Sequence, residues 1–181
     1  MDEEEGITAD KWGRGRDYGS LVHRFFEMAI KGFLPADEEG YILQQVLSVG
    51  LKKNLAPAAK KALDDFRASE IWREIEAADK VYTEVPFAVP VEVENGEVLR
   101  GIIDLVYRTP EGWKIVDYKT NVTSSESEIR KLIDHYVSQV NTYAEQWQTI
   151  TGEEVVEKGA YSSTSSAIRA GMRMLKLAQR N

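Results

Sequence analysis

Asp104, Asp117 and Lys119 stand in two short β-like runs of the stretch GIIDLVYRTPEGWKIVDYKT, at positions 101–120. Asp104 interrupts the first apolar run, and Asp117 and Lys119 end the second. Carboxylate oxygens suit Mg²⁺ or Mn²⁺, and a neighbouring ammonium can orient a water or neutralise a phosphate. These residue types favour metal-assisted phosphodiester hydrolysis. The alternative from these residues alone is a hydrogen-bonded structural Asp, because charges are rarely placed in apolar strands without a partner.

The same stretch predicts a β-hairpin whose turn is Thr109-Pro110-Glu111-Gly112. Side chains on a strand point alternately to opposite faces. This alternation predicts two sets that each share one face: Trp113, Ile115, Asp117 and Lys119 in the second strand, and Ile102, Asp104 and Val106 in the first. Pairing of the two strands would let both carboxylates and the ammonium converge.

Helices are predicted before the hairpin, over residues 19–31, 37–54, from 57 through 66, and 70–78. The first has a wide apolar face on which His23 lies among Leu21, Val22, Phe25 and Phe26. His23 is either a satisfied residue at the edge of the core or a ligand that completes the carboxylate site. The other helices indicate a shell over the core, or a wall that shapes access to it.

Strand-like patterns begin at Lys80, with runs over residues 81–89 and 91–94, the turn signal Asn95-Gly96, and a strand over 98–107. Glu84 is either a solvated strand residue or a further carboxylate of the site. A long helix follows the hairpin, with a capping box at Ser125 and Glu128, and ends at Thr151-Gly152.

Gln139 and Tyr143 are four residues apart on one face of that long helix. They are either a pair at the edge of the core or contacts to a substrate phosphate and the metal site. A strand is predicted over residues 155–161 and a last helix over 167–179. That helix carries a local basic patch, which includes Arg169 and Arg173, and no Asp or Glu occurs from 163 to 181.

Composition limits the class of protein. The chain has 181 residues, 43% hydrophobic and 29% charged, which is typical of a globular domain. We expect a flexible lead-in or linker over 1–18 and a single domain over 19–181, made of a helical block (19–79) and an α/β core (80–181). The absence of cysteine excludes disulfides, a thiol nucleophile and an iron–sulfur cluster.

Charge and hydropathy limit partners and compartment. The net charge of −7 by itself argues against nucleic acid as a partner, although the basic patch near the C-terminus can hold a polyanion locally. No apolar run approaches the ~20 residues needed to span a bilayer, and the acidic N-terminus lacks the pattern of a signal peptide. We expect a cytoplasmic protein that makes no contact with a membrane.

Five short motifs in order together resemble the RecB-like branch of the PD-(D/E)XK nuclease superfamily, most closely the C-terminal nuclease domain of the RecB and AddA helicase–nucleases. They are Gly19-x-x-x-His23, Glu84-x-Pro86-Phe87, Gly101-x-x-Asp104, Asp117-Tyr118-Lys119 and Gln139-x-x-x-Tyr143, and the resemblance covers residues 19–161. None is specific alone. Ile103 stands where the superfamily name expects Pro, and the cysteines of iron–sulfur relatives are absent.

The resemblance implies an Mg²⁺ site, in which Mn²⁺ can substitute. Its ligands would be His23, Asp104, Asp117 and the main-chain carbonyl of Tyr118, with Glu84 as an acidic residue nearby. Lys119 would be the catalytic lysine that positions the attacking water. Gln139 and Tyr143 would organise the site and contact DNA.

The expected fold is therefore α/β, a restriction-endonuclease-like core with a central mixed sheet flanked by helices and an N-terminal helical block. The expected function is that of a metal-dependent deoxyribonuclease, exonuclease or endonuclease, acting on single-stranded DNA or DNA ends in repair or recombination. The chain has no ATP-binding G-x-x-x-x-G-K-[S/T] motif, so a helicase domain or subunit, in cis or in trans, would supply unwinding. The alternatives are a non-catalytic nuclease-fold module that binds DNA or a partner protein, and a sequence-specific endonuclease on the same core.

Overall fold

The computed structural model describes residues 15–90, 98–120 and 126–162. In chain order the elements are α1 (Arg16–Ile30), α2 (Glu38–Ser48), the 3₁₀ turn η1 (Lys53–Leu55), α3 (Ala56–Arg67), α4 (Glu70–Ala77), β1 (Lys80–Pro90), β2 (Val98–Thr109), β3 (Gly112–Lys119), α5 (Glu126–Thr151) and β4 (Val155–Ser162). The capping residue Ser125, the turn at Asn95-Gly96 and the last predicted helix, with Arg169 and Arg173, lie outside the described residues.

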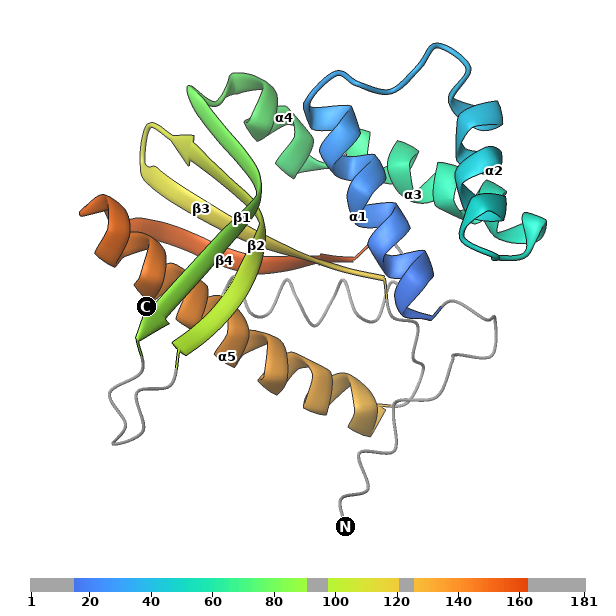
Figure 1. Cartoon of the computed structure of the whole chain (residues 1–181). Helices are drawn as coiled ribbons and strands as arrows, with labels where there is room; N and C mark the ends of the chain where they lie inside the picture. Colours follow the sequence, from blue (N-terminus) through green and yellow to red (C-terminus); the bar gives the residue numbers. More distant parts are fainter. Residues whose placement is uncertain (1–14, 91–97, 121–125, 163–181) are drawn as a thin grey trace.

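The strands form one mixed sheet in the order β1-β2-β3-β4. The first three strands are antiparallel, and β4 is parallel to β3 because α5 carries the chain back along the sheet. Helices α1–α4 cover one face of the sheet and α5 crosses the other (Figure 1). The predicted α/β fold, with helices on both faces and a helical block at the N-terminus, is confirmed. No helix in the described part of the chain is long and apolar enough to cross a membrane.

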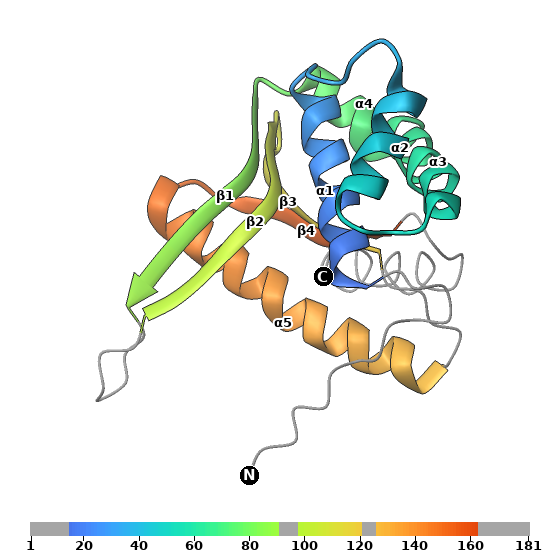
Figure 2. The ribbon, with the colours of Figure 1, turned by 45° about the vertical axis from the view of Figure 1, so that its right-hand side comes forward.

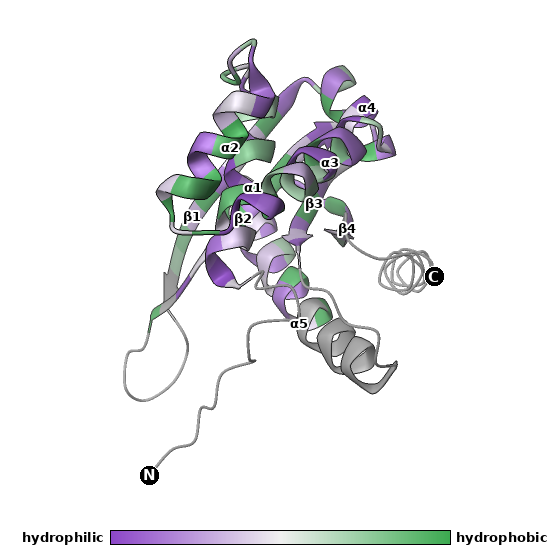
Figure 3. Cartoon of the chain, turned by 90° about the vertical axis from the view of Figure 1, so that its right-hand side faces the viewer, coloured by the Kyte–Doolittle hydropathy of each residue, from purple (hydrophilic) through white to green (hydrophobic). Residues whose placement is uncertain are grey.

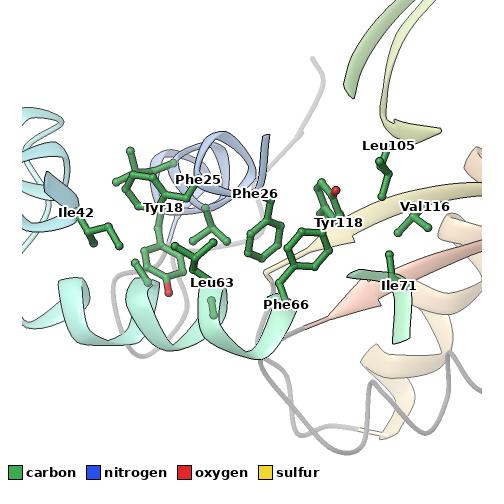
Figure 4. Close-up of a cluster of buried hydrophobic side chains, with 14 of the residues drawn as sticks. Tyr18, Phe25, Phe26, Ile42, Leu63, Phe66, Ile71, Leu105, Val116 and Tyr118 are labelled. Atoms are coloured by element: carbon green, nitrogen blue, oxygen red, sulfur yellow. The ribbon is translucent and has the colours of Figure 1, made fainter. Parts of the chain in front are cut away.

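The larger core joins the helical block to the sheet. The buried stripe of α1 is Tyr18, Leu21, Val22, Phe25 and Phe26, whose spacing places them on one side of a helix. Phe26 stacks on Phe66 of α3 with ring centroids 4.4 Å apart, and both rings meet Tyr118 of β3 edge-on (Figure 4). This contact holds α1 against the end of β3, where the predicted site lies.

The short helices follow local capping rules. Ser69 accepts a hydrogen bond from the backbone N–H of Trp72 and so caps α4, as Asp37 caps α2 through Gly40. The prediction that the second helix continues to residue 54 was wrong, because α2 ends at Ser48. Gly50 has a φ of 76°, a left-handed conformation that commonly terminates helices. Hydrophilic and hydrophobic residues alternate along α2 and α3, as expected for helices with one buried side (Figure 3).

Strand β3 follows the predicted alternation and β2 does not. Trp113 and Ile115 pack in the cluster under α5, while Val116 and Tyr118 pack under the helical block. In β2 both Ile103 and Val106 face the α5 cluster, which strict alternation forbids. Val106 packs under α5 whereas Asp104 faces His23 of α1, so the shared face predicted for Ile102, Asp104 and Val106 was wrong. The irregularity falls at Asp104.

Candidate metal centre

Three side chains of metal-ligand type converge from three different elements. His23 comes from α1, Glu84 from β1 and Asp104 from β2, and one ligand atom of each lies within 4.8 Å of the others. His23 Nδ1 is 3.5 Å from Asp104 Oδ1. One imidazole nitrogen with carboxylate oxygens is a donor set that suits a divalent cation such as Mg²⁺ or Mn²⁺.

His23 reaches the sheet because α1 approaches the end of β3 closely. Gly19 lies one helical turn before His23, and a Cβ at Gly19 would be 2.8 Å from Thr120 Oγ1. The His23 ring also packs edge-on against Tyr118, with centroids 5.4 Å apart. The glycine of the Gly19-x-x-x-His23 motif therefore allows the contact that places the imidazole.

Glu84 has a strained backbone. Its φ of 51° is the one positive value at a non-glycine position among the described residues. The paired positions run from Thr83–Leu105 to Val85–Ile103 without a Glu84–Asp104 pair. Thr83 faces Glu27 of α1, but Val85 packs in the α5 cluster. The left-handed backbone conformation of Glu84 thus changes which side chains of β1 face α1 and which face α5. Backbone strain of this kind concentrates at functional sites.

Asp104 is held by two partners. Its Oδ2 accepts a 2.6 Å hydrogen bond from the backbone N–H of Tyr118, and its Oδ1 faces His23. The carboxylate is buried. This arrangement fixes the rotamer of Asp104 and leaves Oδ1 directed at the other two members of the group.

Asp117 and Lys119 form a second, adjacent pair. Lys119 Nζ lies 2.5 Å from Asp117 Oδ2, which makes the two side chains a close ion pair. Asp117 is 3% exposed. The β2–β3 pairing ends at Leu105–Val116, so Asp104 and Asp117 stand just beyond its last pair, one on each strand, and their charges interact. The tightest group nevertheless contains Glu84 in place of the predicted ligand Asp117.

Two residues of helix α5, Gln139 and Tyr143, hold Lys119 through a chain of hydrogen bonds. Lys119 Nζ donates to Gln139 Oε1 at 3.3 Å, and Gln139 Nε2 donates to the Tyr143 hydroxyl at 2.5 Å. Tyr143 is 6% exposed. The pair predicted to contact DNA therefore lies beneath the lysine, in contact with the ion pair of the site.

The electrostatics show an excess of negative charge at the centre. Burial raises the pKa of Asp117 to about 6, with Lys119 opposing the shift and Asp104 adding to it. Burial also raises the pKa of Glu84, and the Asp104 charge adds to that shift. For His23, burial lowers the pKa, but the hydrogen bond and charge of Asp104 outweigh it, and the net pKa is raised. A bound divalent cation would relieve this excess of negative charge, so the residues fit the metal that the motifs imply.

Sequence reasoning missed the supporting roles of Gly19, Gly101 and Phe87. Phe87 is paired with Gly101 across β1 and β2, and its ring meets Tyr143 edge-on at 5.4 Å. All three residues stand in the five motifs, so position within a motif was the available signal. What each one touches depends on contacts between elements far apart in the sequence.

Comparison with known proteins points to one family. A family model described as the PD-(D/E)XK nuclease superfamily matches residues 2–179. Relatives whose names describe subunits of ATP-dependent helicase/nucleases include those of Staphylococcus haemolyticus (32% identical, 82% of this chain and 14% of the relative), Levilactobacillus brevis (28%, 66% and 10%) and Desulforamulus reducens (26%, 89% and 13%). The chain thus spans only a small part of the length of the relatives it matches. The predicted likeness to helicase–nucleases is confirmed.

Proposed function

The chain belongs to the PD-(D/E)XK nuclease superfamily, and from this premise we propose that it hydrolyses DNA phosphodiester bonds in a reaction that depends on Mg²⁺, with Mn²⁺ able to replace it. The observation that carries the proposal is the convergence of His23, Glu84 and Asp104 beside the Asp117–Lys119 ion pair. Metal-assisted hydrolysis of a phosphodiester uses acidic metal ligands with a lysine beside them, and these groups meet near the end of β3.

The protein ligands would be His23 and Asp104, with Glu84, Asp117 and the carbonyl of Tyr118 completing the site. A divalent cation held by these groups would supply positive charge to the scissile phosphate. Asp104 is suited to bind it because the backbone of Tyr118 already fixes one of its oxygens. Asp117 is suited because its buried carboxylate carries a desolvation penalty that a cation would offset.

Lys119 would position the attacking water and stabilise the negative charge that develops on the phosphate. Its ammonium lies between the carboxylate of Asp117 and the amide oxygen of Gln139. Two acceptors on different elements restrict where the ammonium can point, and such restriction is how an active site lowers the barrier of a displacement on phosphorus.

The substrate would be single-stranded DNA or a DNA end. The relatives carry names that describe helicase/nuclease subunits, and a helicase domain or subunit would deliver an unwound strand to this centre. The net charge of −7 supports delivery of the strand by a helicase, because an acidic chain binds DNA weakly unaided. Arg169 and Arg173 are the proposed phosphate contacts, whereas Gln139 and Tyr143 would act on the substrate only through Lys119.

A non-catalytic module that binds DNA or a partner protein is the alternative from another class. Loss of a carboxylate or of the lysine would favour it, yet Asp104, Asp117 and Lys119 are all present. The catalytic proposal is therefore preferred.

The decisive experiment measures degradation of end-labelled single-stranded DNA with Mn²⁺ or Mg²⁺ and with EDTA. The wild-type chain should cleave only with metal, and Asp117→Ala and Lys119→Ala should each abolish cleavage. Cleavage that survives both substitutions would overturn the assignment. The assay should be repeated in the presence of a helicase partner, because a partner that delivers the strand would raise the rate of cleavage.

Calorimetric titration with Mn²⁺ tests the ligand set without relying on catalysis. His23→Ala should weaken binding of Mn²⁺, whereas Lys61→Ala, a substitution on exposed α3 surface, should leave it unchanged. Equal affinity in His23→Ala and the wild type would return His23 to a purely structural role.

A further inference from the structure

Phe87 lies at the far end of a chain of contacts that leads to Lys119. Its ring is buried and meets Tyr143 edge-on, with centroids 5.4 Å apart and planes at 73°. The Tyr143 hydroxyl accepts a hydrogen bond from Gln139 Nε2, and Gln139 Oε1 accepts one from Lys119 Nζ. Each link joins residues on different elements or successive turns of α5, so the contacts form one continuous path.

Two backbone features bring the ring to Tyr143. The positive φ of Glu84 shifts β1 so that Val85 and Phe87 face the cluster under α5. Gly101 stands opposite Phe87 on β2, and a Cβ there would be 2.5 Å from Phe87 Cε1 and Cζ. The ring therefore occupies space that only glycine leaves open. Figure 2 shows β1 and β2 extending together past α5 in this region.

The position of the Gln139 amide depends on Tyr143, which holds its second hydrogen bond. An amide has a donor end and an acceptor end, and its hydrogen-bond partners decide which way it points. The Lys119 ammonium only donates, so Gln139 presents Oε1 to it, and Nε2 is left to donate to the Tyr143 hydroxyl. If the phenol moved, the amide would lose this second hydrogen bond, and the oxygen that accepts from Lys119 would no longer be held in one position.

We infer that Phe87 is a positioning residue for Lys119, and that it acts by holding Tyr143 and, through it, the Gln139 amide. Gly101 permits this by leaving room for the ring. The role rests on the proposed function, because Lys119 matters to turnover only if the chain hydrolyses phosphodiesters. The placement of the ammonium can nevertheless be measured without any hydrolysis.

The first test follows Lys119 by NMR relaxation of its ¹³Cε group in the metal-free protein. Phe87→Leu should increase the mobility of this group. The control is Trp147→Leu, which removes another buried ring of the same cluster one turn further along α5 and contacts Trp113. The control should lose stability and leave Lys119 as ordered as in the wild type. Equal mobility of Lys119 in Phe87→Leu and the wild type would overturn the inference.

Gly101→Ala is a second variant that keeps the ring but displaces it, and it should mobilise Lys119 as well. In the double variant Phe87→Leu/Gly101→Ala the new methyl group fills space that the ring vacates. Thermal stability should then recover relative to Phe87→Leu, while Lys119 stays mobile. Recovery of both properties together would assign Phe87 to packing alone.

The second test uses hydrolysis of single-stranded DNA. Phe87→Leu should lower kcat on the order of tenfold, with KM changed by less than about twofold, because a displaced lysine acts on the chemical step. In a Gln139→Ala background the same substitution should have no further effect on kcat, and a full additional loss would contradict the path. If the wild type cleaves nothing, the proposed function fails, and the NMR measurement still decides the role of Phe87.

Discussion

The backbone N–H of Tyr118 donates a 2.6 Å hydrogen bond to Oδ2 of Asp104, and this bond joins β3 to β2 at the site itself. Tyr118 lies between Asp117 and Lys119 in β3, so the bond fixes the position of all three relative to β2. The part of the sheet that carries the candidate metal centre is therefore positioned by the strand pairing and by this one hydrogen bond from backbone to side chain. His23 is then added by the packing of α1 against Tyr118.

Asp104→Asn separates the charge of Asp104 from its structural bond. Asparagine keeps an oxygen that can accept from Tyr118 N–H, but it removes one of three neighbouring negative charges. We expect cleavage to fall by at least about 10³-fold, while the free energy of unfolding in metal-free buffer stays within about 1 kcal/mol of the wild type. Asp104→Ala should lose about 1–3 kcal/mol, because it leaves a buried N–H unpaired. Urea unfolding in EDTA measures this; equal destabilisation by Asn and Ala would contradict it.

Glu84→Gly and Glu84→Ala should differ in stability although both remove the same carboxylate. Glycine adopts the left-handed conformation freely, whereas alanine keeps the strain that a φ of 51° imposes. The glycine variant should be more stable than the alanine variant by about 1 kcal/mol. Thermal unfolding of both variants in EDTA provides the comparison. A more stable alanine variant would mean that Glu84 relaxes to an ordinary strand conformation once its carboxylate is gone.

The hairpin and its lysine were predictable because they depend on local rules. Alternation along β3 correctly put Trp113 and Ile115 on one face, where both pack in the cluster under α5, and the turn between Thr109 and Gly112 gave the pairing with β2. The motif order also predicted that His23 and Asp104 belong together, which their 3.5 Å separation agrees with. These features need only strand periodicity and motif order.

The left-handed backbone conformation of Glu84 could not be predicted in the same way. Its neighbours Thr83 and Val85 favour an ordinary strand, and the strain is tolerated only because the surrounding sheet and α1 hold it. The side chains of β2 also change face around Asp104, where the β1–β2 pairing skips both Glu84 and Asp104, so alternation failed there too. The position of Gln139 beneath Lys119 depends on how α5 crosses the sheet, which no local pattern contains.

Gly19→Ala should weaken metal binding even though alanine favours a helix. In an exposed helix the change typically stabilises by about 1 kcal/mol, but here the added Cβ would lie 2.8 Å from Thr120 Oγ1. We expect α1 to shift and the affinity for Mn²⁺ to fall by about three- to tenfold, because His23 moves with the helix. The double variant Gly19→Ala/Thr120→Ala removes the clashing hydroxyl and should recover most of the affinity in calorimetry. Failure of this rescue would show that His23 is not placed by the Gly19–Thr120 contact.

Glu38 and Arg67 join α2 to α3 through two hydrogen bonds of 2.9 and 2.7 Å. The Arg67 guanidinium holds the pKa of Glu38 below its usual value, so this stabilisation is complete above the unfolded pKa and is lost as pH falls through the lower folded pKa. Glu38→Gln should reduce the free energy of unfolding by about 0.5–1 kcal/mol at pH 7, and by much less at pH 3. Glu39→Gln, in the same exposed first turn, is the control for the helix dipole. The free energy of unfolding should be measured with urea at both pH values. An equal loss of stability in Glu38→Gln at pH 7 and pH 3 would contradict a contribution from the Glu38–Arg67 pair. An equal loss in Glu39→Gln and Glu38→Gln would contradict it as well.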